Sequence, residues 1–244
     1  MTASKIHWPL RTEASLEVFL LGLVDFDAAL FLQERFLHEI SQRDDNSGVV
    51  LVCEHPALVT VGREGSQSHI LCEPEELVAR QIPVRRLNRG GGCLMHAPGQ
   101  LAVYPIIPLN RRGVGLADYR ERLEQAVMDM CTEFRVPTWR QEEAGVWCRC
   151  GQLAHLGAAV RSGISYHGLF INVSPRLDAL RLVKSNPLGG RVTSLSAQRL
   201  KPTAMPATRE SVIRHLAAQL NYERYHLYTG HPLLRRTKRV VAYA

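Results

Sequence analysis

Arg89-Gly-Gly-Gly-Cys-Leu-Met-His96-Ala-Pro-Gly-Gln100 is the most unusual stretch of the chain and lies between two strand-like runs, 82–87 and 101–107. Three consecutive glycines let the backbone approach a ligand closely, and their N–H groups can face a carbonyl or phosphate oxygen because no Cβ stands in the way. The stretch lacks the Lys-Ser/Thr ending of a Walker loop, and the chain has no Gly-x-Gly-x-x-Gly run. We therefore expect a ligand-binding loop that is not a nucleotide site of either kind.

Apolar periodicity on both sides of this loop predicts strands and helices joined by short connections. The expected strands are 16–23, 49–53, 82–87, 101–107, 166–173 and a hairpin over 146–160 that turns near Gly151; the expected helices are 26–40, 116–134 and a last one capped by Thr208 and carrying Val212, Leu216 and Leu220. Several strands follow one another without a helix between them. The sequence therefore predicts an α/β (α+β) fold, with a mixed, largely antiparallel sheet flanked by helices.

The chain is expected to divide near residue 202, where Pro202 and Pro206 indicate a turn. Residues 1–202 would form the main domain, and 203–244 a small C-terminal helical and basic tail. The tail holds a cluster of basic residues, Arg235, Arg236, Lys238 and Arg239. No aromatic residues are interleaved with them, so a solvated end is favoured over a nucleic-acid-binding arm.

The composition of the 244 residues, 45% hydrophobic and 22% charged, is that of a globular protein and excludes disorder, collagen-like repeats and coiled coil. The longest apolar run, Val18–Val24, is too short to span a membrane, and residues 1–11 lack the apolar core of a signal peptide. We therefore expect a cytoplasmic protein with six reduced cysteines. The Cys148-Arg-Cys150 spacing is too tight for the usual metal motif, and we assign neither a metal nor a cofactor.

Five ordered segments resemble the signature of the lipoyl(octanoyl) transferase family, within the biotin/lipoate protein ligase superfamily. The glycine loop is similar to the family's Arg-Gly-Gly-x-x-x-x-His-Gly-Pro-Gly-Gln. The other four segments are Glu54-His-Pro-Ala-Leu-Val-Thr60-Val-Gly62-Arg63, Gly145-Val-Trp147 with Leu153-Ala-His-Leu-Gly157, Tyr166-His167-Gly168-Leu-Phe-Ile-Asn172, and Asn186-Pro187-Leu188-Gly189 with Val192-Thr-Ser194-Leu. The matches extend across almost the whole chain.

The resemblance implies a biotin/lipoate ligase-like fold with an octanoyl pocket. By position, that pocket would be lined by Arg89, Gly90, Gly91, Gly92, Cys93, Leu94, Met95, His96, His155, Leu156, Gly157, Gly168, Leu169 and Phe170. The family passes octanoyl from acyl-carrier protein to an enzyme cysteine, and then to a lysine of a lipoyl domain of 2-oxoacid dehydrogenases or of the glycine cleavage H protein. A net charge of +7 suits these acidic partners. No nucleic acid or membrane partner is implied.

The two residues that carry the family chemistry are replaced here. Leu188 stands where the family has its cysteine, and Gln152 where it has its lysine. Cys93 is a weak substitute nucleophile, with His96 or His167 as a base, although a buried thiol and structural histidines are the alternative reading. Lys184 lies four residues before Leu188 and could bend toward the pocket, although a solvated surface lysine is the favoured reading. Direct transfer from thioester to amine, without a covalent intermediate, needs only positioning and an oxyanion site.

Two hypotheses remain open from the sequence. The first is an octanoyltransferase of lipoate biosynthesis with a rearranged or non-covalent mechanism. The second is a non-catalytic pseudoenzyme that binds the acyl group or the lipoyl domain. The family framework favours the first hypothesis, whereas Leu188 and Gln152 favour the second.

Overall fold

A seven-stranded sheet, ordered β10-β1-β2-β6-β9-β8-β7, forms the centre of the computed structural model, which describes residues 14–185, 190–199 and 203–234. Its strands are β1 (Ser15–Leu23), β2 (Gly48–Glu54), β6 (Gln100–Ile106), β7 (Gly145–Cys148), β8 (Gly151–Arg161), β9 (Ile164–Asn172) and β10 (Arg224–Thr229). β1 pairs with β2 and with β10 in parallel, and every other pair in this sheet is antiparallel. The predicted mixed, largely antiparallel sheet is confirmed.

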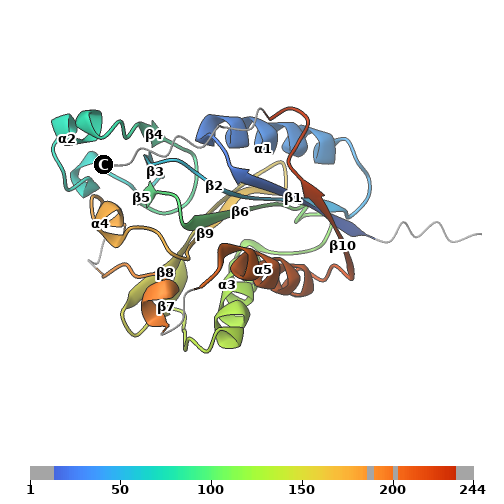
Figure 1. Ribbon diagram of the computed structural model, residues 1–244. Helices are drawn as coiled ribbons and strands as arrows, with labels where there is room; N and C mark the ends of the chain where they lie inside the picture. Colours follow the sequence, from blue (N-terminus) through green and yellow to red (C-terminus); the bar gives the residue numbers. More distant parts are fainter. Residues whose placement is uncertain (1–13, 186–189, 200–202, 235–244) are drawn as a thin grey trace, which may run out of the picture.

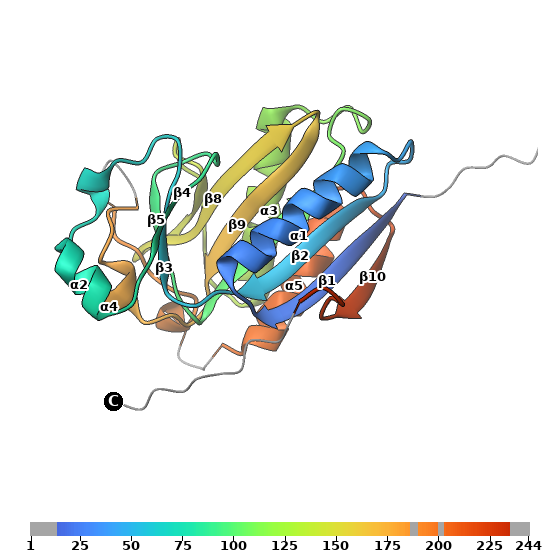
Figure 2. The ribbon, with the colours of Figure 1, turned by 90° about the horizontal axis from the view of Figure 1, so that it is seen from above.

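Helices cover both faces of the sheet. α1 (Phe26–Ser41) lies on one face, and α3 (Leu116–Glu133) and α5 (Met205–Gln219) lie on the other (Figures 1 and 2). α1 begins where predicted because the Asp25 side chain accepts hydrogen bonds from the N–H groups of Asp27 and Ala28. Since strand residues alternate between faces, Leu169 packs into the α3–α5 core and Phe170 into the α1 core. No helix in the described part of the chain is long and apolar enough to cross a bilayer.

A second, smaller sheet, ordered β4-β3-β5, stands beside the main one (Figure 2). It consists of β3 (Leu58–Val61), β4 (Val84–Arg86) and β5 (Cys93–His96), with α2 (Pro74–Ala79), α4 (Leu177–Leu180) and two short 3-10 turns, Gln67–His69 and Ser196–Gln198, completing the fold. The strand expected at 82–87 is therefore shorter and belongs to this sheet. All three β4 residues are exposed, because the strand lies at the sheet edge.

The elements that follow residue 202 are built into the main core. α5 packs along α3, with Val212 and Leu216 completely buried, and β10 pairs with β1 as an edge strand. A boundary at 202 stays a prediction, but the region beyond it is not a separate tail. Thr208 does not cap α5: the helix begins at Met205, three residues earlier, and the Thr208 hydroxyl donates to the carbonyl of Ala204. The four basic residues of 235–239 lie outside the described residues.

A cluster of hydrogen-bonded polar side chains joins α3 to α5 at the outer edge of their contact. Glu133 accepts hydrogen bonds from Ser211 and Arg214, and His215 Nε2 lies 2.9 Å from its Oε1. The bonds from Arg214 and Ser211 lower the pKa of Glu133 from 4.5 to about 2. Because the pKa is lower in the folded state, the cluster stabilises the fold above pH 4.5, and this contribution is lost as pH falls toward 2.

We expect Glu133→Gln to lower the free energy of unfolding at pH 7 by about 1 kcal/mol, because the cluster is largely solvent-exposed. The difference between the variant and the wild type should shrink as the pH of a urea titration is lowered toward 3 or so. Glu121→Gln, on the exposed side of the same helix, is the matched control and should change little. A Glu133→Gln effect that stays constant with pH would contradict this role.

Candidate functional site

The glycine loop is held against the turn that follows β3. The N–H groups of Gly62, Arg63 and Glu64 donate to the carbonyls of Gly92, Arg89 and Gly91 at 3.1, 3.0 and 3.2 Å. A Cβ at residue 62 would collide with the carbonyl of Gly91, so only glycine lets the two segments come so close. The resemblance segment that ends at Arg63 and the glycine loop therefore form one structural unit.

The N–H groups of Gly90 and Gly91 do not face a ligand. Gly90 donates to the carbonyl of Ala158 on β8 at 3.0 Å, and Gly91 donates to Glu64 Oε1 at 3.1 Å. For these two glycines the expectation of free donors is wrong, because the loop uses them to fix its own position. Gly157 makes the approach to β8 possible, since a Cβ there would lie 3.0 Å from the carbonyl oxygen of Gly90.

Arg89 is completely buried and orders the loop from within. Its Nη1 donates to the carbonyl of Gly90 at 2.9 Å, and its Nη2 donates to the carbonyl and the hydroxyl of Thr60 at 2.9 and 2.7 Å. Burial lowers the pKa of the guanidinium to about 10, so it remains charged at neutral pH. Removing the Arg89 guanidinium would leave the buried oxygens of Gly90 and Thr60 without these hydrogen-bond donors.

A chain of hydrogen bonds runs onward from Thr60. The Thr60 hydroxyl donates to His96 Nε2 at 2.8 Å, His96 Nδ1 donates to Gln100 Oε1 at 2.9 Å, and Gln100 Nε2 donates to Asn172 Oδ1 at 2.9 Å. This order assigns the His96 tautomer. Burial holds the His96 pKa well below 6.5, so the ring stays neutral. His96 supports Arg89 and is not placed to act as a base.

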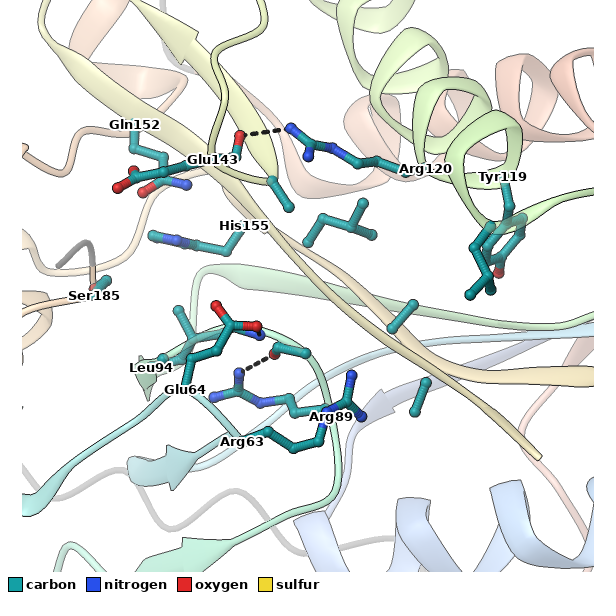
Figure 3. A pocket seen from close by; sticks show the side chains of 18 of the residues that line it. Arg63, Glu64, Arg89, Leu94, Tyr119, Arg120, Glu143, Gln152, His155 and Ser185 are labelled. Carbon is teal, nitrogen blue, oxygen red and sulfur yellow. Dashed lines mark hydrogen bonds between the residues drawn. The ribbon is translucent and has the colours of Figure 1, made fainter. Parts of the chain in front are cut away.

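A cleft of about 850 Å³ opens between the glycine loop and β8 (Figure 3). Six of its lining residues are glycine or alanine, which occupy little space and leave room in the cleft. Four more are leucine or valine. These are Gly90, Gly91, Gly92, Ala144, Ala158 and Ala159, with Leu94, Leu116, Leu156 and Val160. The volume falls within the usual range for small-ligand sites, and these linings suit an unbranched apolar chain.

The start of α3 closes a further side of the cleft. Arg120 Nη2 donates to the carbonyls of Gln141, Glu142 and Glu143 at 3.0, 2.9 and 2.9 Å, and so holds that segment beside the helix (Figure 3). The buried Glu124 accepts from the N–H of Gly145 at 2.9 Å. These contacts fix the cleft wall formed by residues 142–144.

Half of the pocket residues implied by the resemblance line this cleft: Arg89, Gly90, Gly91, Gly92, Leu94, His155 and Leu156. The other half lie behind it or in the cores. Met95 faces the small-sheet core, Leu169 and Phe170 pack under the helices, and Gly168 lies against the carbonyl of Val103. Their role is to build the sheet behind the cleft.

Two polar side chains of β8 face the cleft. Burial, together with the nearby Arg89 charge, lowers the pKa of His155 to about 3, so His155 is neutral near pH 7 and too weak to act as a base there. Gln152 is 3% exposed, and its Oε1 has no hydrogen-bond partner in the described part of the chain. A buried acceptor without a donor is costly, so Gln152 points to a ligand that carries an N–H group.

The substitute residues considered from the sequence do not meet in the cleft. The Cys93 thiol is buried in the small-sheet core and donates to the carbonyl of Ser66, and its pKa is raised by burial. That environment is opposite to the one that activates a thiol, so Cys93 is withdrawn as a nucleophile. His167 lies under α1, where its backbone N–H donates to Gln33 Oε1 at 2.8 Å. Lys184 is exposed, and Leu188 lies outside the described residues.

Several lining residues are not apparent from the sequence. Tyr119 and Arg120 carry no motif, and they reach the cleft only because α3 crosses the sheet at that point. Ser185 lines the opposite end, where its carbonyl would lie 3.6 Å from a Cβ on Gly92. Arg63 is the last residue of a segment that resembles the family and Glu64 follows it, which is the one signal that points to them.

Comparison with known proteins agrees with this geometry. The sequence model of the lipoyl protein ligase A/B catalytic domain matches residues 25–217. An octanoyltransferase of Geotalea uraniireducens is 38% identical over 182 residues, covering 73% of this chain and 80% of its own. One of Geobacter metallireducens is 34% identical over 216 residues, covering 87% and 97%.

Solved structures share the fold at low sequence identity. A lipoate-protein ligase A bound with ATP aligns with a TM-score of 0.73 and 14% identity, over 89% of this chain and 90% of its own. The bipartite lipoate protein ligase of Thermoplasma acidophilum aligns with a TM-score of 0.73 and 15% identity, over 90% and 88%. The expected biotin/lipoate ligase-like fold is confirmed.

Proposed function

The chain belongs to the lipoyl protein ligase A/B catalytic domain family, and from that premise we propose that it transfers an octanoyl group from acyl-carrier protein to a lysine of a lipoyl domain in lipoate biosynthesis. The observation that carries this proposal is the cleft of small and aliphatic residues between the glycine loop and β8. Burying the six methylenes of an octanoyl chain there would contribute up to about 5 kcal/mol.

The reaction needs one bond formed and one broken at the acyl carbonyl. In the net reaction, the lysine amine of the lipoyl domain gains the octanoyl group as an amide, the C–S bond of the carrier thioester breaks, and the carrier leaves as a thiol that takes up the proton lost by the amine. The Gln152 oxygen is suited to accept an N–H of that amine, because it is buried at the cleft and lacks a donor among the described residues. Positioning of this kind lowers the barrier without a titrating group.

The partners of this reaction are octanoyl-acyl-carrier protein and the lipoyl domains of 2-oxoacid dehydrogenases or the glycine cleavage H protein. The net charge of +7 supports docking of such acidic proteins. A cytoplasmic location stays a prediction.

A second candidate is a non-catalytic protein that only binds the acyl group or the lipoyl domain. One observation favours it: among the described residues, no cysteine lines the cleft. The cleft would then bind the octanoyl chain without transferring it.

Intact-mass measurement separates the two candidates. The purified protein is incubated with octanoyl-carrier protein and an apo lipoyl domain, and the masses of both partners are followed with time. Transfer predicts a gain of one octanoyl group on the lipoyl domain above the uncatalysed rate. Unchanged masses, with the carrier still bound, would support the binding protein.

A further inference from the structure

A hollow of about 840 Å³ adjoins the cleft and holds two reactive side chains that the cleft lacks. Cys150, on the turn between β7 and β8, and Lys184 both line it. Arg181 and Arg191 line it as well, and we call it the cationic hollow. All four side chains belong to exposed residues, so partners in solution can reach them.

The cationic hollow and the cleft share one lining residue, Ser185. Ser185 lines both spaces, and Figure 3 shows it on the same side of the view as Gln152 and His155. The backbone N–H of Gln152 donates to the carbonyl of Arg191 at 2.7 Å, so the start of β8 is bonded to a residue that lines the cationic hollow. An acyl chain in the cleft could therefore present its carbonyl to the cationic hollow.

Backbone hydrogen bonds hold the two sides of the cationic hollow in place. The N–H of Lys184 donates to the carbonyl of His69 at 2.7 Å, and the N–H of Thr193 donates to the carbonyl of Gln152 at 3.0 Å. The two anchors lie on either side of the segment that contains Leu188. Lys184 and Arg191, which line the cationic hollow, thus flank that segment in the sequence.

The surroundings of Cys150 are exposed and cationic. Cys150 is the exposed one of the six cysteines, four of which are buried and one of which, Cys72, is half-buried. Three cations line the hollow, no acidic residue of the described chain does, and none of the three forms an ion pair within that part of the chain. Lys184 is also the only lysine among the described residues. Cys150 is therefore the one cysteine that lies exposed in a hollow lined by cations.

A second observation indicates a ligand at this junction. Gln152 lies two residues beyond Cys150, is 3% exposed, and has a side-chain oxygen without a partner in the described residues. An amine delivered to an acyl group on Cys150 would supply the missing N–H. The thiol and the cations thus line the cationic hollow, and the acceptor lines the cleft that shares Ser185 with it.

We propose that Cys150 and Lys184 form a relocated nucleophile–cation pair, in which Cys150 Sγ accepts the octanoyl group and Lys184 stabilises its thiolate. This inference rests on the proposed octanoyl transfer. The thiolate attacks the carrier thioester, a new thioester forms on Cys150, and the carrier leaves as a thiolate that takes up a proton. The lysine amine of the lipoyl domain then forms the amide, releases the Cys150 thiolate and gives up its proton.

The test begins with octanoyl-carrier protein and no lipoyl domain. We expect wild-type protein to gain one octanoyl mass, on the peptide that contains Cys150, in a form removed by hydroxylamine. Cys150→Ala should abolish the adduct, whereas Cys72→Ala should retain it. Lys184→Gln should slow adduct formation by about tenfold, and Lys184→Arg should restore much of the rate, with thermal unfolding showing that each variant is folded.

Adding an apo lipoyl domain distinguishes failure of this pair from failure of octanoyl transfer. Loss of the adduct as octanoyl appears on the domain supports the pair. Wild-type transfer that is matched by Cys150→Ala would overturn the pair and leave octanoyl transfer standing. An adduct that persists in Cys150→Ala, or no adduct on wild type, would also overturn the pair. An adduct on Cys150 that never reaches the domain would support acylation of Cys150 but not the proposed transfer.

Discussion

Arg89→Met is expected to lower the free energy of unfolding by about 3 kcal/mol, because the methionine fills the space but cannot donate to the buried oxygens of Thr60 and Gly90. The hydrogen-bond chain through His96 would lose its first donor. The glycine loop should then loosen, and octanoyl-carrier protein should bind at least about tenfold more weakly. Urea unfolding and a carrier titration measure the two effects.

Two variants control for charge and for shape. Arg86→Met removes an exposed arginine of β4 and should change neither quantity by much. Arg89→Lys keeps the charge but loses the planar fork, so it should recover only part of the stability. Unchanged stability and carrier binding in Arg89→Met would show that the buried guanidinium does not organise the site.

Leu188→Cys combined with Gln152→Lys is expected to raise octanoyl transfer by about a hundredfold, since it places a thiol and an amine at the two positions that match the family. Gln152 is 3% exposed, so a lysine there would be partly desolvated. Desolvation lowers the pKa of an amine and makes it a better base near neutral pH. Initial rates of octanoyl appearance on the lipoyl domain check the gain.

The matched control is Leu188→Ala with Gln152→Lys, which supplies the amine without the thiol and should show no comparable gain. A triple variant, which adds Cys150→Ala to the double variant, should keep the higher rate. The thiol introduced at residue 188 then accepts the octanoyl group in place of Cys150. A double variant as slow as wild type would show that the cleft no longer presents an acyl carbonyl to residue 188.

Most of the fold could be predicted because its elements carry their own signals. α1 has an Asp cap and helical apolar spacing, and the β7–β8 hairpin turns at Gly151. β10 could not be predicted, since five of its six residues are exposed and it pairs with β1 across more than 200 positions of sequence. The sequence predicts no separate strand at β5, because nothing local distinguishes its four residues from the glycine loop that precedes them.

The sequence predicts those parts of the site whose position depends on the course of the backbone. The glycine loop and the β8 residues His155 and Leu156 line the cleft as expected. Side-chain direction was the part that sequence could not settle: Cys93 and Met95 point into the small-sheet core, while Leu94 between them faces the cleft. Cys150 and Lys184 line one hollow, and no local pattern indicates this, because the bridge between Gln152 and Val192 and the bond from Lys184 to His69 join segments far apart in the sequence.

The most direct measurement is the affinity for carrier protein with and without its acyl chain. An octanoyl carrier whose thioester is replaced by an amide, which cannot be transferred, is titrated against the carrier that bears no acyl group. We expect the acylated form to bind at least about tenfold more tightly, and Ala158→Phe, which fills the cleft, to remove that preference while Val78→Phe on exposed α2 retains it. Equal affinities for the two carriers, or a preference that survives Ala158→Phe, would contradict the claim that this cleft holds the octanoyl chain.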